Sequence, residues 1–200
     1  MFFNPGGIYH IYNRGNNKNI LFRDDESYLL FLNNIQKQVK PFSDILAWTL
    51  MPNHFHLMLH ANEKSIAPRL SGKNKIQELA YRIGILLSSY SQTINWKNGT
   101  TGSLFQQKTK ARSLFTADAL RNWNTRQNHY IINCMHYIHQ NAWRAGLVRR
   151  IEDWKYSSFP DYSGLRNGTL CNKKTLIDLT GYDLTTFYKD SYEIIKDFKL

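Results

Sequence analysis

Residues 50–60 combine a turn signal with alternating side-chain character, and this pattern limits the possible folds more than any other in the chain. The run is Leu50-Met51-Pro52-Asn53-His54-Phe55-His56-Leu57-Met58-Leu59-His60. Successive side chains on a strand point to opposite faces, so His54 and His56 share one face about 6–7 Å apart. The apolar residues between and after them take the other face. We therefore predict a hairpin whose return strand, residues 54–60, carries half of a metal site.

The rest of the pattern completes a β-α-β-β-α-β order. We predict strands at residues 8–14, 45–51, 54–60 and 104–114, and helices at 24–40 and 76–94. This order is typical of the ferredoxin-like fold, an α+β arrangement in which both helices cover one face of an antiparallel sheet. The apolar side of the hairpin should meet the helices, so we expect the histidines on the open face.

The sequence after the fourth strand has a different character. A further helical segment is expected to begin near Thr116 and to resume over residues 128–141. Beyond about residue 150 we expect an aromatic loop and two short helices, near 173–179 and 184–198. We therefore predict a main domain over residues 1–150, with a C-terminal loop and short helices, residues 151–200, packed on it.

The charge balance indicates a polyanionic partner. The chain has 26 Lys and Arg against 15 Asp and Glu, a net charge of +11 with a pI near 9.6. Nucleic acid and an anionic membrane both fit this charge. Because no basic amphipathic helix with a broad apolar face is found, we favour nucleic acid.

The sequence also indicates the compartment. It shows no signal-peptide pattern at the N-terminus and no apolar run of membrane-spanning length, so we expect no membrane partner. Two cysteines, Cys134 and Cys171, are too few for a disulfide framework or a cysteine-rich zinc site. We expect a cytoplasmic, nucleoid-associated protein.

The helical segment around residue 137 supplies a nucleophile and a third ligand. A core stripe is predicted at Ile131, Met135, Ile138 and Ala142, and the adjacent stripe contains Tyr130, Cys134, Tyr137 and Asn141. If this helix lies across the histidine face, Tyr137 reaches a phosphate bound there. Asn141, or Gln140 beside it, adds an oxygen ligand, and Tyr130 is the rival nucleophile.

These residue types fit phosphodiester chemistry. A divalent cation held by imidazole nitrogens and an amide oxygen polarises a phosphoryl oxygen and stabilises the leaving oxyanion. Such a ligand set suits Mg²⁺ or Mn²⁺, and imidazole favours Mn²⁺. A tyrosine hydroxyl, with a pKa of about 10, needs activation, and its attack gives a covalent intermediate from which a strand can be rejoined.

Other polar and aromatic residues fit surface, core or DNA-contact roles. We interpret His60 as a surface or DNA-facing residue, and His136 and His139 as solvated or near the phosphate backbone. The aromatics Tyr12, Phe105 and Trp143 either stack on unpaired bases or pack in the core. Five basic residues are predicted to contact DNA phosphates: Arg14, Lys108, Lys110, Arg112 and Arg144.

Two anchor motifs together resemble the HUH single-tyrosine transposases, and most closely their REP-associated branch. The anchors are residues 50–56 and the run Tyr137-Ile138-His139-Gln140-Asn141-Ala142-Trp143-Arg144-Ala145-Gly146-Leu147-Val148. Residues 9–15, 102–106 and 154–158 are similar to the family's opening strand, fourth strand and tail. The likeness spans roughly residues 6–164.

The resemblance implies a transposase-like strand transferase that nicks single-stranded DNA beside a hairpin and can rejoin it. His54, His56 and Asn141 would be metal ligands. Tyr137 would form a 5′-phosphotyrosine. The implied partner is single-stranded DNA with hairpin ends, and the implied state is a monomer or a homodimer.

Two alternatives remain from the sequence. The first is an inactive single-stranded nucleic-acid-binding module on the same fold, for which the basic charge, the aromatics and an open sheet would suffice. The second is a structural zinc protein using His54, His56 and a cysteine, which the wide cysteine spacing disfavours.

Overall fold

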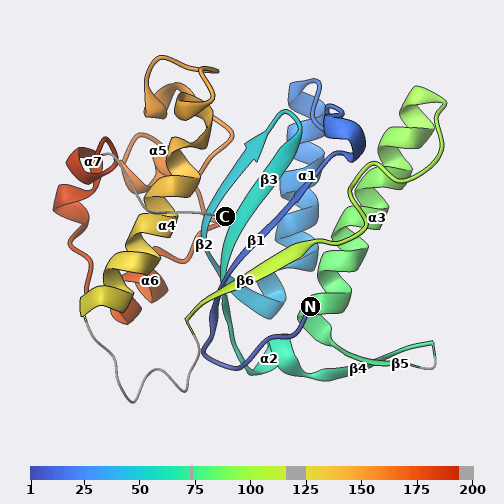
Figure 1. Ribbon diagram of the computed structural model, residues 1–200, viewed down its shortest axis with the longest axis horizontal. Coiled ribbons are helices and arrows are strands. Elements are labelled where there is room, and N and C mark those ends of the chain that lie inside the picture. The colour runs from blue at the N-terminus through green and yellow to red at the C-terminus, as the bar shows by residue number, and fades with distance from the viewer. Residues whose placement is uncertain (73, 116–124, 194–200) are drawn as a thin grey trace.

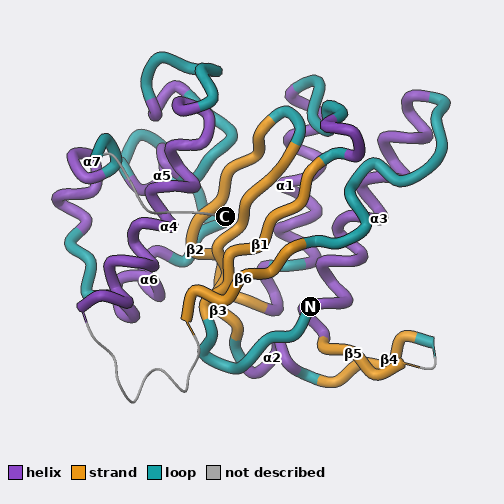
Figure 2. The backbone as a smooth tube through the Cα atoms, viewed as in Figure 1, coloured by secondary structure: helices purple, strands orange, loops and turns teal. Residues whose placement is uncertain are grey.

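The hairpin over residues 43–61 forms half of a four-stranded sheet in the computed structural model, which describes residues 1–72, 74–115 and 125–193. β2 (Ser43–Met51) and β3 (His54–Ala61) pair antiparallel across the Pro52-Asn53 turn. β1 (Ile8–Arg14) pairs antiparallel with β3, and β6 (Lys110–Phe115) pairs antiparallel with β1 (Figures 1 and 2). The resulting order β2-β3-β1-β6 is that of a ferredoxin-like sheet, which confirms the predicted fold class.

Two helices cover one face of this sheet, as predicted. α1 (Asp25–Gln38) and α3 (Glu78–Asn98) pack against each other there (Figure 1). α1 begins with a capping box, in which the Asp24 carboxylate accepts the Ser27 N–H and the Ser27 hydroxyl accepts the Asp24 N–H. Beneath the helices lies an aromatic core that includes Phe31, Phe55 and Tyr90, all fully buried.

The other face is partly covered, which corrects the expectation of an open face. α4 (Thr125–Arg144) packs on it, chiefly over β2 and less over β3 and β6 (Figure 1). Every member of the predicted core stripe of α4 is fully buried: Ile131, Met135, Ile138 and Ala142. The first three of these residues belong to a second hydrophobic core, in which they pack with Leu46 and Met58 of the sheet. The helix carrying Tyr137 therefore does lie across the histidine face.

The C-terminal segment packs against α4 and β2. It contains α5 (Phe159–Tyr162), α6 (Lys173–Thr180) and α7 (Phe187–Asp190), and Phe159 and Phe187 are buried in the α4 core. In place of the last predicted helix, 184–198, the described residues contain the shorter helix α7, which ends at Asp190. Both the expected helical start near Thr116 and the chain beyond Glu193 lie outside the described residues.

Two segments differ from the sequence prediction. The fourth strand begins at Lys110 rather than at residue 104, because Phe105 turns into the aromatic core and only bridges Gly15. Between β3 and α3 the chain forms the short helix α2 (Glu63–Ile66) and an unpredicted hairpin of β4 (Pro68–Ser71) and β5 (Asn74–Gln77). Across the residues that the structure describes, no helix has the length and apolar character needed to cross a membrane.

Candidate active site

The register of the sheet places the candidate residues in rows across one face. Tyr12 pairs with His56 on one side and with Lys110 on the other. Arg14 pairs with His54 at the end of the same two strands. Cross-strand partners share a face and neighbouring strands lie about 4.8 Å apart, so Lys110 is about 10 Å from His56.

The two motif histidines are held by hydrogen bonds at their Nδ1 atoms. His54 Nδ1 lies 2.7 Å from Asn53 Oδ1, so the ring donates to the amide oxygen and its Nε2 keeps the lone pair. His56 Nδ1 lies 2.8 Å from His10 Nε2. The His54 and His56 rings are 5.0 Å apart between centroids and nearly perpendicular, at 87°. This spacing lets two ring nitrogens converge on one small ion.

Tyr137 and Asn141 of α4 lie beside these histidines. The Tyr137 ring meets the His56 ring edge-on, with 5.9 Å between centroids and an interplanar angle of 84°. The Asn141 side chain donates to the Tyr137 carbonyl at 2.8 Å, and it also interacts with the His54 ring and the Tyr137 hydroxyl. A predicted nucleophile and a predicted oxygen donor therefore lie next to both histidines.

The neighbours of these residues on α4 face the C-terminal segment instead. Gln140 is 1% exposed and donates to the carbonyls of Ser191 and Glu193 at 2.9 and 2.8 Å. Of the two third-ligand candidates, only Asn141 therefore lies at the histidines. The interpretation of His136 and His139 as solvated is wrong, because both are buried and hydrogen-bonded to serines of that segment.

Burial keeps the site histidines neutral. Desolvation and, to a smaller extent, the Arg14 charge lower the pKa of His54 to about 4, and the Asn141 interaction opposes the shift. Desolvation and the neighbouring His10 and His54 hold the pKa of His56 well below its usual value. Neutral imidazoles are the form that binds metal ions, so the protonation state of these two rings does not oppose metal ligation at neutral pH.

Tyr137 is not activated by its protein surroundings. Its pKa is raised, mainly by desolvation, against the opposing effects of the Asn141 hydrogen bond and the Arg144 charge. The hydroxyl is therefore protonated at neutral pH and needs a bound group to assist its ionisation. Tyr130, the rival nucleophile, lies two turns earlier, where its ring is 6.0 Å from the Arg112 guanidinium carbon.

The predicted phosphate-contacting residues form a basic margin around the histidines. All five are exposed: Arg14, Lys108, Lys110, Arg112 and Arg144. The charges of Arg14, Arg112 and Arg144 lower the pKa of His54, His10 and Tyr137 respectively. His60 is half-buried and lies 3.2 Å from Asp44, at the far end of β3.

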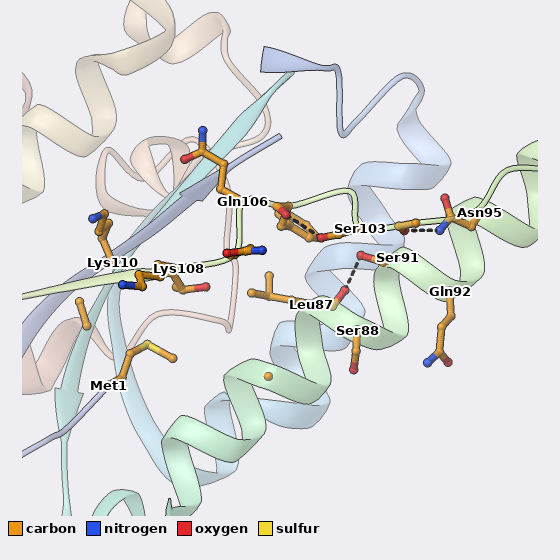
Figure 3. A pocket seen from close by; sticks show the side chains of 16 residues that line it. Met1, Leu87, Ser88, Ser91, Gln92, Asn95, Ser103, Gln106, Lys108 and Lys110 are labelled. Carbon is orange, nitrogen blue, oxygen red and sulfur yellow. Dashed lines mark hydrogen bonds between the residues drawn. The ribbon is translucent and has the colours of Figure 1, made fainter. Parts of the chain in front are cut away.

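A groove of about 930 Å³ adjoins this margin between α3 and residues 102–111. Figure 3 shows Leu87 pointing from α3 toward the segment that carries Lys108 and Lys110. No Asp or Glu occurs among the described residues that line it, although the chain has 15. Its polar lining is Ser88, Ser91, Gln92, Asn95, Ser103, Gln106, Gln107, Lys108, Thr109 and Lys110. This surface favours a polyanion with hydrogen-bonding edges.

The donor set decides which ion the site fits. Over the described ranges of the chain, no three His, Cys, Asp or Glu side chains form a group that could hold a metal ion. A three-ligand site at His54 and His56 therefore needs the Asn141 amide oxygen, which suits Mg²⁺ or Mn²⁺ better than a structural zinc ion. Cys134 is fully buried in the α4 core, with desolvation raising its pKa, so it behaves as an apolar core residue.

Sequence reasoning missed two residues of this site, His10 and Asn53. Both hold motif histidines, as described above. A signal for His10 was present, because His10, Tyr12 and Arg14 alternate along β1 as the histidines alternate along β3. Once β1 and β3 are taken as sheet neighbours, this alternation places both sets on one face.

Comparison with solved structures supports the fold. The chain is similar to a structure described as a REP-associated tyrosine transposase bound to a REP hairpin, with a TM-score of 0.60 and 16% sequence identity. The match covers 99% of this chain and 92% of the other. No protein-family model and no curated protein matches the sequence. At this identity the likeness establishes the shared architecture of the two chains.

Proposed function

We propose that this protein is a metal-dependent DNA strand transferase that nicks single-stranded DNA beside a hairpin through Tyr137. The observation that carries the proposal is the position of Tyr137, edge-on to His56 and bonded through its carbonyl to Asn141, which also interacts with the His54 ring. The hairpin bound in the structurally similar transposase supports hairpin DNA as the substrate class. Tyr137 and His56 of one chain lie together, which supports attack by the tyrosine of the same chain.

In the proposed reaction, the Tyr137 hydroxyl oxygen attacks the phosphorus of a phosphodiester. A bond forms between this oxygen and phosphorus, and the bond from phosphorus to the 3′ oxygen breaks. The tyrosine hydroxyl loses its proton, and the leaving oxygen ends as a free 3′-hydroxyl. The 5′-phosphotyrosine keeps the phosphoester linkage, so a 3′-hydroxyl can attack it in the reverse direction and rejoin a strand.

A divalent cation fits the donor set. His54 and His56 would hold it through their Nε2 atoms and Asn141 through its amide oxygen. When bound, it supplies charge stabilisation at the phosphoryl and leaving oxygens and favours ionisation of a nearby hydroxyl. The raised pKa of Tyr137 makes such assistance necessary at neutral pH.

The basic margin provides a surface along which a DNA strand can bind. Arg14 pairs with His54 and Arg144 lies near Tyr137, while Lys110 links the histidines to the groove beside α3. We propose that phosphates of the strand follow these charges and that unpaired nucleotides reach the amide-lined groove. Exposed amides hydrogen-bond base edges that pairing would hide in a duplex.

A covalent trapping experiment tests the proposal. Single-stranded oligonucleotides that cover the DNA flanking the gene, labelled at the 3′ end, are incubated with the protein and Mg²⁺, Mn²⁺ or EDTA. We expect the labelled fragment to become attached to the protein in a denaturing gel only with a divalent cation. Mass spectrometry should locate the attachment at Tyr137.

The same experiment distinguishes the inactive binding module. That protein would bind the hairpin oligonucleotides with strong salt dependence, yet give no adduct and no free 3′-hydroxyl with any cation. An adduct that forms equally in EDTA would refute the metal dependence and leave a metal-independent nuclease.

Asn141 and Gln140 provide a matched pair for the third ligand. We expect Asn141→Ala to weaken Mn²⁺ binding by at least about tenfold, because the site loses an oxygen donor, and Asn141→Asp to retain binding. Gln140→Ala should keep Mn²⁺ affinity. It should instead lose about 1–3 kcal/mol of stability, because two carbonyls of the C-terminal segment lose their donor.

The measurement is a titration of Mn²⁺ followed by electron paramagnetic resonance, with thermal unfolding of each variant in parallel. Equal Mn²⁺ affinity in Asn141→Ala and the unaltered protein would remove Asn141 from the ligand set. A loss of Mn²⁺ affinity in Gln140→Ala but not in Asn141→Ala would assign the third ligand position to Gln140.

A further inference from the structure

A third histidine, outside the two anchor motifs, contacts the candidate metal ligand His56. His10 of β1 lies diagonally across from His56 of β3, with its Nε2 2.8 Å from His56 Nδ1. The two rings stack at 26° with centroids 5.0 Å apart. His10 is 0% exposed and His56 is 2% exposed, so water does not replace this hydrogen bond.

Two proton arrangements are possible for a hydrogen bond between two neutral imidazoles, and they have opposite consequences. If His56 Nδ1–H donates to His10, then His56 Nε2 keeps a lone pair and can bind a cation. If His10 Nε2–H donates instead, the proton of His56 is on Nε2 and that atom cannot be a ligand. The partner of His56 therefore decides whether His56 is a metal ligand at all.

We propose that His10 is a positioning residue that accepts the Nδ1 proton of His56 and so presents His56 Nε2 to the cation. The inference rests on the proposed function and deepens it. Asn53 makes the equivalent interaction with His54, since its amide oxygen accepts the Nδ1 proton of that ring. Both rings then have the same tautomer, with both Nε2 lone pairs available for one ion.

The contact also fixes the direction of the His56 ring. A buried imidazole without its partner leaves a polar nitrogen unsatisfied, which costs about 1–3 kcal/mol and favours rotation of the ring toward another partner. A ring that has rotated no longer aims Nε2 at the position that His54 and Asn141 share. Loss of His10 should therefore weaken metal binding without removing any ligand.

Three variants test the role. In His10→Leu the acceptor is absent, and in His10→Gln an amide oxygen can still accept the Nδ1 proton. His60→Leu is the matched control, because His60 lies on the same face of β3 and bonds Asp44, away from the site. Mn²⁺ affinity is measured by electron paramagnetic resonance without DNA. Nitrogen-15 NMR of the metal-free proteins reports the His56 tautomer, and thermal unfolding shows that each variant is folded.

We expect His10→Leu to bind Mn²⁺ about 10–100-fold more weakly, and His10→Gln and His60→Leu to stay near the unaltered protein. In the unaltered protein the His56 proton should be on Nδ1. A folded His10→Leu variant with undiminished Mn²⁺ affinity, or a His56 proton on Nε2, would overturn the positioning role alone. An unaltered protein that takes up no Mn²⁺ would overturn the role and the metal-dependent function together.

Discussion

Tyr137→Phe is expected to abolish strand cleavage and the covalent DNA adduct while leaving hairpin binding intact. The substitution removes only the hydroxyl oxygen, the proposed nucleophile, and keeps the aromatic ring that meets His56 edge-on. Loss of a covalent nucleophile should reduce the cleavage rate by at least about 10³-fold. DNA affinity should not change, because the basic margin is untouched.

The comparison variant is Tyr130→Phe. Tyr130 is on the same helix stripe but seven residues earlier, about 10 Å along the axis, so it cannot attack a phosphate bound at the histidines. It should keep full cleavage. Cleavage rates come from single-turnover gel assays and affinities from fluorescence anisotropy on the same oligonucleotide. An adduct that persists in Tyr137→Phe and disappears in Tyr130→Phe would show that Tyr130 is the nucleophile and Tyr137 is not.

The parts of the fold that the sequence predicts are those set by local pattern. Alternation of side-chain type predicts β1 and the start of β3 where the structure has them, at Ile8 and His54. The predicted helix start at residue 24 lies one residue before α1, at its N-cap. These features depend on neighbours within four residues, which the sequence displays directly.

The parts that the sequence does not predict depend on distant partners. A helical wheel separates Gln140 from Asn141 by one position, but it does not show that the C-terminal segment covers the Gln140 side. Phe105 is a residue type that favours strands. It packs in the core between α1, α3 and the sheet instead of pairing in β6. Tertiary packing overrides local propensity at both places.

Acidification to about pH 5 is expected to destabilise this protein strongly. Four histidines are at most 3% exposed: His10, His56, His136 and His139. Desolvation lowers the pKa of His10 to about 3 and that of His136 to about 4, and it holds those of His56 and His139 well below 6.5. All four are neutral in the folded protein, whereas in the unfolded chain each has a pKa of about 6.5.

The direction of the effect follows from proton binding. Between pH 6.5 and the lowered pKa values, the unfolded chain binds more protons than the folded protein, so stability falls as the pH falls. At pH 5 His10 and His136 each cost about 2 kcal/mol, and His56 and His139 add to this loss. A domain of this kind has a total stability of about 5–15 kcal/mol, so this loss is a large part of the whole. Stability should be nearly constant above pH 7.5.

Urea unfolding followed by circular dichroism at pH 8, 7, 6 and 5 measures this loss. The slope of the unfolding free energy against pH near pH 5 should correspond to the uptake of at least two protons. His136→Gln keeps a polar side chain beside Ser191 and Tyr182 but cannot titrate, so its slope should be smaller by about one proton. An unfolding midpoint that is equal at pH 7 and pH 5 would show that these histidines gain protons within the folded protein, contrary to their burial.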